Sequence, residues 1–389
     1  MIEFANRQGS DCYKWDSAEA QGTLPLWVAD MDFKAASPIL RALQKRLDHG
    51  VFGYNIVPDR YYEAVSNWFS RRHGWQGIGR RNSIPTTGVV PALSAVLKAR
   101  TMALREKGDG RPLKVMTFTP AYNCFFSSIR NMEAELTACP LTEKDGHYEI
   151  DFEACERQIE GVDVLLLCNP HNPTGRVWTR DELLLLAGMC DFYGTYVISD
   201  EIHCELTLQG HPYTPYATVA DDSDWYCVLT SASKAFNIAG LQCANIFTAD
   251  RREYERIDRA INIHEVCDLN PFGVEATIAA YNECGEWIDE LNGVIAQNRR
   301  LLERMTAEQM PQLRLTDQEG TYLAWADIRR TGIDADTFCR RLAAEEKVLL
   351  NASGMYSCEG FVRINLATSA EILTEALTRL ARFVQSLNI

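Results

Sequence analysis

The chain has 389 residues, 46% of them hydrophobic and 24% charged, a composition typical of a globular protein large enough for two domains. Its formal net charge of −14 argues against nucleic acid or an anionic membrane as a partner. The first residues lack the pattern of a secretory signal, and no apolar run is long enough to cross a bilayer. We therefore expect a cytoplasmic protein without membrane partners.

Three helices are predicted in the first part of the chain. Ser37 followed by Pro38 is typical of a helix N-cap and first helical position, and Gly50 is a suitable end for that helix. Apolar residues at helical spacing predict a second helix within residues 61–74, and a third begins near Val89.

In the middle of the chain, short apolar runs alternate with helical patterns. We expect strands at residues 115–118, 162–168, 196–199 and 226–230, with a helix over residues 179–191. This alternation predicts an α/β fold with a mainly parallel sheet covered on both faces.

From about Pro271 the pattern changes to long helices, then to a mixed region that ends in a helix over residues 371–385. This change indicates a second, smaller α+β domain. We therefore predict a large domain over residues 46–275 and a small C-terminal domain over residues 276–389. Residues 1–45 are predicted to contribute to the small domain.

Polar segments follow three of the predicted strands, which is where ligands of open α/β sheets bind. The first reads Asn-Pro-His-Asn-Pro-Thr-Gly over residues 169–175, and the second reads Ser-Asp-Glu-Ile-His over residues 199–203. The third, over residues 230–240, places a lysine among small polar residues. The 13 cysteines show no metal-binding spacing, so no metal site is expected.

Asp200 and Lys234 each allow two interpretations from these residues alone. An acid at the tip of a buried strand needs a partner, and a protonated ring nitrogen of a ligand would serve as well as a helix N-cap or a salt bridge. A lysine in this setting is either solvated or an amine nucleophile in a semi-buried pocket. The order of the three segments along the chain favours the ligand.

In that order, the segments resemble the fold-type-I enzymes that use pyridoxal phosphate (PLP), the aspartate-aminotransferase superfamily. Within it the chain resembles most the MalY/PatB-type carbon–sulfur lyases, a cystathionine β-lyase subgroup. The likeness covers nearly the whole chain. It rests on residues 27–33 (Trp-Val-Ala-Asp-Met-Asp-Phe), 52–54, 86–93, 168–175, 199–203, 233–241 and 360–365.

The resemblance implies a role for each polar residue. Lys234 would hold PLP as a Schiff base, Asp200 would pair with its pyridinium nitrogen, and Asn172 would donate to its phenolate oxygen. Arg363 would bind the α-carboxylate of an amino-acid substrate. The other implied PLP contacts are Tyr122 stacked on the ring, Gly88, Val89, Ser231 and Ser233 at the phosphate, and His203 near the phenolate oxygen.

Tyr54 follows Gly53, just after the predicted helix end at Gly50. The resemblance implies that Tyr54 reaches the PLP phosphate of a neighbouring subunit, so that a homodimer shares its active sites. The residues alone leave open a tyrosine packed within its own subunit. Gln242 stands where many members of the superfamily have a phosphate-binding arginine. A further hydrogen-bond donor to the phosphate is therefore more useful here.

The implied reaction is a β-elimination that converts cystathionine or a related S-substituted cysteine to pyruvate, ammonia and a thiol. Two alternatives remain at this point. One is an aminotransferase that uses the same residues, and the other is a regulatory binding protein that retains PLP. Residues 351–359 lack the glycine- and phenylalanine-rich loop associated with these lyases, which leaves the substrate specificity open.

Overall fold

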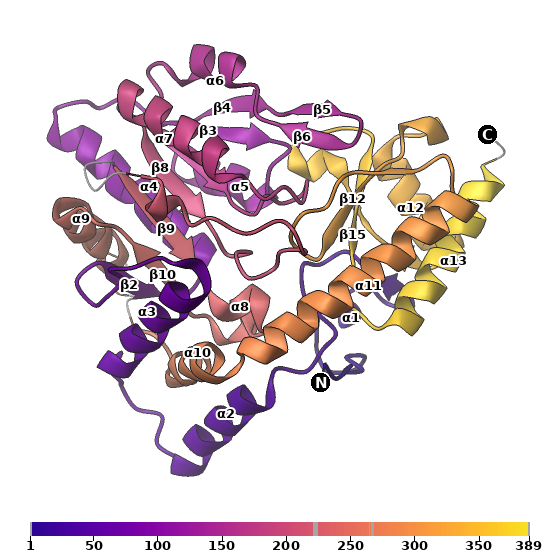
Figure 1. Ribbon diagram of the computed structural model, residues 1–389, viewed down its shortest axis with the longest axis horizontal. Coiled ribbons are helices and arrows are strands. Elements are labelled where there is room, and N and C mark those ends of the chain that lie inside the picture. Colours follow the sequence, from indigo (N-terminus) through magenta and orange to yellow (C-terminus); the bar gives the residue numbers. More distant parts are fainter. Residues whose placement is uncertain (1, 221–224, 264, 266–267, 388–389) are drawn as a thin grey trace.

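The computed structural model of the chain describes residues 2–220, 225–263, 265 and 268–387. Its centre is a seven-stranded sheet (Figure 1) with the strand order β2-β10-β9-β8-β7-β3-β4. Strands β4, β3, β7, β8 and β9 run parallel, whereas β10 is antiparallel to both β9 and β2. The strands are β2 (Ser83–Thr86), β3 (Lys114–Thr119), β4 (Glu135–Pro140), β7 (Val164–Cys168), β8 (Tyr196–Asp200), β9 (Tyr226–Thr230) and β10 (Ala244–Phe247).

Side chains of the central strands alternate between two hydrophobic cores, as the period of a β-strand requires. Along β7, Val164 and Leu166 face one core, whereas Leu165 and Leu167 face the other. Helices α4 (Val89–Glu106), α5 (Asn123–Asn131) and α9 (Arg251–Asn262) cover the first face. The second face is covered by α3 (Asp59–His73), α6 (Phe152–Ile159), α7 (Arg180–Tyr193) and α10 (Pro271–Glu283). The prediction of a mainly parallel sheet covered on both faces is confirmed.

The helix signals in the sequence lie at or near the observed ends. Helix α2 (Ser37–His49) ends at Gly50 and α3 ends at Gly74, both in the left-handed conformation that glycine adopts without strain. Thr179 caps α7 in a reciprocal capping box with Glu182. The assignment of Ser37 as the N-cap of α2 is wrong, because the helix already includes Ser37 and its N-cap is Ala36.

A second, four-stranded antiparallel sheet has the order β11-β12-β15-β14 and a core of its own. Leu26 joins this core, and β1 (Leu24–Pro25) pairs with β13 (Val348–Leu349), so the N-terminal segment lies against the C-terminal part of the chain. The elements of this region are β11 (Arg314–Leu315), β12 (Leu323–Asp327), β14 (Asn351–Ala352), β15 (Phe361–Asn365), α12 (Ala335–Glu345) and α13 (Ala370–Ser386).

Helix α11 (Gly285–Gln309) runs from α10, beside the large sheet, to the helices of the small sheet (Figure 1). The predicted domain limits fall within α2 and α10, so the division at residues 45/46 and 275/276 stays a prediction. Among the described residues, no helix is both long and apolar enough to span a membrane.

Candidate active site

The two residues with the strongest sequence signal lie at the carboxyl edge of the parallel strands. Asp200 is the last residue of β8, and Lys234 lies in the short helix α8 (Ala232–Ala235), which follows β9. The Asp200 side chain is buried and that of Lys234 is half-buried, and the charge of each shifts the pKa of the other. Adjacent parallel strands therefore bring an acid and an amine together although 33 residues of sequence separate them.

Asp200 is 4% exposed, and its carboxylate accepts a hydrogen bond from the Ile202 N–H at 3.1 Å. Burial raises the pKa of Asp200 to about 7, against the smaller lowering effects of that hydrogen bond and of Lys234. A cationic partner would stabilise the ionised form of a carboxylate buried in this way. A protonated ring nitrogen would supply one.

Lys234 donates from Nζ to the carbonyl oxygen of Ala29 at 2.6 Å. Burial lowers the pKa of the Lys234 ammonium, and Asp30 is the first of the nearby charges that oppose this effect. The amine is therefore closer to its neutral, nucleophilic form than a solvated lysine at the same pH.

Arg363 and Asn172 contact each other directly, although β15 carries the first and the segment after β7 carries the second. The Arg363 guanidinium donates from Nη1 to Asn172 Oδ1 at 3.1 Å and from Nη2 to the Trp27 carbonyl at 2.9 Å. Its Nε is buried without a hydrogen-bond partner in the described part of the chain. Because Asn172 turns its oxygen to Arg363, its amide nitrogen is the end left to donate to a ligand.

Tyr122 and His203 lie close to the same charges. Burial, then Cys124 and Asp200, raise the pKa of the Tyr122 phenol, whereas Arg363 lowers it. Burial lowers the pKa of His203 to about 3, and Lys234 and Arg363 act in the same direction. The His203 ring is therefore neutral, and its Nδ1 has no hydrogen-bond partner among the residues that the structure describes.

The predicted phosphate contacts lie at two helix starts. Gly88 is the N-cap of α4 and Val89 its first residue, so the first N–H groups of an 18-residue helix point out of its end. Ser231 caps α8 and accepts a hydrogen bond from the Ser233 N–H at 3.0 Å. Its hydroxyl donates to the Cys243 carbonyl at 2.6 Å, so Ser231 reaches a phosphate only if that proton is redirected. Ser233 lies one residue before Lys234, partly exposed.

Residues 27–33, one of the segments on which the resemblance rests, cross this site. We call this segment the strap. Besides the bonds from Arg363 and Lys234, the strap receives two from Asn237 Nδ2, to the Met31 carbonyl at 3.1 Å and the Phe33 carbonyl at 2.7 Å. Asn237 adopts a left-handed conformation with φ 55°. Its place three residues after Lys234 and the tolerance of asparagine for positive φ are the signals in the sequence that point to it.

Tyr54 is not brought to this site within its own chain. It lies in the irregular segment between α2 and α3 and its side chain is fully exposed, at 101%. Phe52 nearby stacks on Phe272, with ring centroids 5.7 Å apart. The sequence left open both a packed and a projecting tyrosine, and in this chain Tyr54 projects into solvent.

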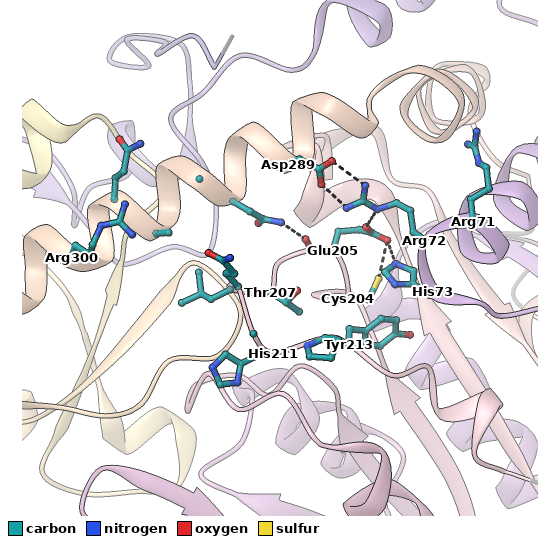
Figure 2. A pocket seen from close by; sticks show the side chains of 18 residues that line it. Arg71, Arg72, His73, Cys204, Glu205, Thr207, His211, Tyr213, Asp289 and Arg300 are labelled. Atoms are coloured by element: carbon teal, nitrogen blue, oxygen red, sulfur yellow. Dashed lines mark hydrogen bonds and ion pairs between the residues drawn. The ribbon is translucent and has the colours of Figure 1, made fainter.

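A cavity of about 820 Å³ lies elsewhere, between α3, the segment after β8 and α11 (Figure 2). Arg72 bridges Glu205 and Asp289 there, and His73 also contacts Glu205, at 2.7 Å. Among the described residues that line it, none is a predicted site residue. These bonds join α3 to α11 and to the segment after β8.

The residues present fit a PLP molecule. Among the residues that the structure describes, it offers a half-buried lysine amine, a buried carboxylate in need of a cation, an amide that turns its oxygen to Arg363, a helix N-terminus and a neutral histidine whose Nδ1 has no hydrogen-bond partner. These groups match, in kind, the aldehyde, ring nitrogen, phenolate and phosphate of the cofactor. They come from four separate segments, which converge only in the folded chain.

A mainly parallel sheet of this topology, with a lysine and an aspartate at its carboxyl edge and a smaller α+β region beside it, defines the PLP-dependent fold type I. A sequence model of the family described as aminotransferase class I and II matches residues 65–380. The chain belongs to this family.

Individual relatives agree with the predicted resemblance. The chain is 37% identical to cystathionine beta-lyase PatB of Bacillus subtilis, over 96% of this chain and 97% of PatB. It is 31% identical to protein MalY of Escherichia coli, over 99% and 100% of the two chains. The crystal structure of cystalysin from Treponema denticola, which contains PLP, superposes with a TM-score of 0.92 at 31% identity and covers 100% of both chains. The resemblance to the MalY/PatB group is confirmed.

Proposed function

We propose that this protein is a PLP-dependent carbon–sulfur β-lyase that acts on cystathionine or related S-substituted cysteines. The observation that carries the proposal is the convergence of Lys234, Asp200 and the Arg363–Asn172 pair around one site. PatB, a relative along nearly its whole length, is a cystathionine beta-lyase. The overall reaction consumes one water and releases pyruvate, ammonia and the thiol.

PLP, when bound, supplies a ring that withdraws electrons from the substrate Cα. Arg363 binds the α-carboxylate, for which its planar guanidinium is suited, and fixes the orientation of the Cα–H bond. Lys234 Nζ, which burial favours as a neutral amine, takes the Cα proton. Asp200 would hold a proton on the ring nitrogen and so keep the ring cationic. The Cβ–S bond then breaks with its electron pair on sulfur.

The active unit in this proposal is a homodimer in the cytoplasm. Val51, Phe52, Tyr54 and Ile56 form an exposed apolar run between α2 and α3, and such a run is typical of a surface that a second chain covers. Tyr54, fully exposed here, would donate to the PLP phosphate of the neighbouring subunit. Every cysteine that the structure describes is free, which agrees with a reducing compartment.

Pyruvate release from L-cystathionine, with and without 2-oxoglutarate, tests the proposal. A lyase forms pyruvate and ammonia without the keto acid. An aminotransferase, which the same residues would also serve, requires the keto acid and releases no thiol. Absence of both reactions in protein that retains PLP would favour the regulatory binding role and would contradict the proposed function.

A further inference from the structure

Resting on the proposed lyase function, we propose that Arg7 and Asp30 bind the distal end of the substrate, the part that leaves with the sulfur. Asp30 would contact an ammonium and Arg7 a carboxylate. The preferred substrates are then S-substituted cysteines whose sulfur substituent itself ends in an α-amino acid, as in cystathionine.

Asp30 belongs to the strap and directly follows Ala29, whose carbonyl accepts the Lys234 hydrogen bond at 2.6 Å. Asn365 fixes the Asp30 backbone, since its Nδ2 donates to the Asp30 carbonyl at 2.6 Å. After the effect of burial, Asp30 is the first charge to act on the pKa of both Lys234 and the buried Tyr322 phenol. The Asp30 carboxylate therefore lies near enough to the Lys234 amine and the Tyr322 phenol to act on their pKa values.

Along the strap, the residues that contact Arg363 and Lys234 come in the same order as the α-carboxylate and Cα of a substrate. Arg363, the predicted α-carboxylate ligand, contacts Trp27, and Lys234, which acts at Cα, contacts Ala29. Asp30 comes next along the chain, one residue after the Lys234 contact. In our proposal, a substrate held at its carboxylate by Arg363 and with its Cα at Lys234 extends its sulfur substituent toward Asp30.

Arg7 completes a binding surface with two opposite charges. Its Nη2 lies 2.7 Å from Asp30 Oδ2, and the side chains remain 22% and 26% exposed. Its Nη1 donates to the Met31 carbonyl at 2.8 Å and lies 3.7 Å from Asp32 Oδ1, and Asp30 Oδ1 accepts from the Met31 N–H at 3.1 Å. A zwitterionic head group can replace this single ion pair with two, one to each partner.

The neighbouring Lys14–Asp32 ion pair, which also involves the strap, has the features of a purely structural pair. Lys14 Nζ lies 2.8 Å from Asp32 Oδ2 with both side chains fully buried, and Trp15 Nε1 donates to the same carboxylate at 2.8 Å. The Arg7–Asp30 pair, by contrast, is open to solvent, and pairs of that exposure contribute little to stability. The open pair is the one free to exchange its partner for a ligand.

The test compares L-cystathionine with S-propyl-L-cysteine, which has the same scissile half but lacks the distal head group. In the wild-type enzyme we expect kcat/KM for pyruvate release to favour cystathionine by up to about fivefold, because two ion pairs replace one and the net gain is a single partly exposed pair. Asp30→Asn and Arg7→Gln should each lower this ratio, and the double variant should bring it to about 1. Use of the ratio removes any effect of Asp30 on Lys234 that both substrates share.

Glu3→Gln is the matched control, because Glu3 forms an exposed ion pair with Lys34 on the same segment. This variant should keep the wild-type ratio. Equal kcat/KM for the two substrates in the wild-type enzyme, or an unchanged ratio in the double variant, would overturn the inference while the lyase activity stands. Failure of both substrates to yield pyruvate would instead overturn the proposed function, and the inference with it.

Discussion

At the scale of single residues, Asp200 carries the clearest electrostatic consequence. Burial raises its pKa to about 7, whereas an aspartate in an unfolded chain titrates near 3.9. Between these values the folded protein binds a proton that the unfolded chain releases. Without PLP, the stability that this proton contributes is therefore present at low pH and is lost as pH rises toward 7.

Asp200→Asn should remove this pH dependence. We expect the PLP-free variant to be more stable than the PLP-free wild type at about pH 8, by at most about 4 kcal/mol, with the difference vanishing toward pH 4. Urea unfolding of both proteins across this range measures it. A difference that stays constant with pH would show that Asp200 is not the group responsible. The loaded variant should also lose most turnover, because an amide cannot keep the ring nitrogen protonated.

Arg363→Lys should weaken substrate binding more than PLP binding. Lysine keeps the charge but loses the planar fork that binds a carboxylate through two hydrogen bonds. We expect KM to rise by about tenfold or more, with the absorbance of bound PLP unchanged. Unaltered substrate kinetics would mean that another residue binds the α-carboxylate.

The sequence singled out Asp200 and Lys234 by their local setting, and the order of the segments and the resemblance supplied their roles. An aspartate that ends an apolar strand and a lysine among serines both stand out from the residues around them. The sequence could not predict that the Arg363 guanidinium contacts Asn172, because the two residues lie 191 positions apart. Nor could it predict that Cys243 engages the Ser231 hydroxyl, because that carbonyl comes from a different segment.

At the scale of elements, the strap depends on Asn237. We expect Asn237→Ala to destabilise the protein by about 2–4 kcal/mol, since the change deletes three partly buried hydrogen bonds and places alanine at positive φ. Asn237→Gly is the matched control, because glycine accepts φ 55° but offers no amide. Urea unfolding should rank the wild type first, Gly second and Ala last. Equal stability of all three proteins would refute this role for Asn237.

Most elements of the large sheet could be predicted, and the exceptions share a cause. Strands 226–230 and 196–199 are recognisable because they are continuously apolar and buried on both faces. β2 contains a proline at position 85, and β4 is mostly exposed at the edge of the sheet, so neither shows an apolar run. β10 was also missed, because its four residues include Asn245 and it directly follows the lysine segment.

At the scale of the whole molecule, the proposed site requires a dimer in which two chains complete each other's sites. Tyr54→Phe should weaken PLP retention, and Lys234→Ala should lose covalent attachment. In a mixed dimer of these variants, the site with wild-type Lys234 regains a tyrosine only if Tyr54 crosses the interface. We therefore expect recovery of PLP retention on the Tyr54→Phe chain, measured after reassembly with one chain labelled. No recovery, or a fully active monomer, would contradict the shared site.

The central claim is that Lys234 carries the cofactor and acts as the base. Borohydride reduction of the PLP-loaded enzyme, followed by peptide mapping, tests it most directly because reduction makes the lysine–cofactor linkage permanent. We expect a single PLP-modified peptide that contains Lys234, within the Ser-Ala-Ser-Lys sequence of residues 231–234. A modification on any other lysine, with Lys234 unmodified, would contradict the claim.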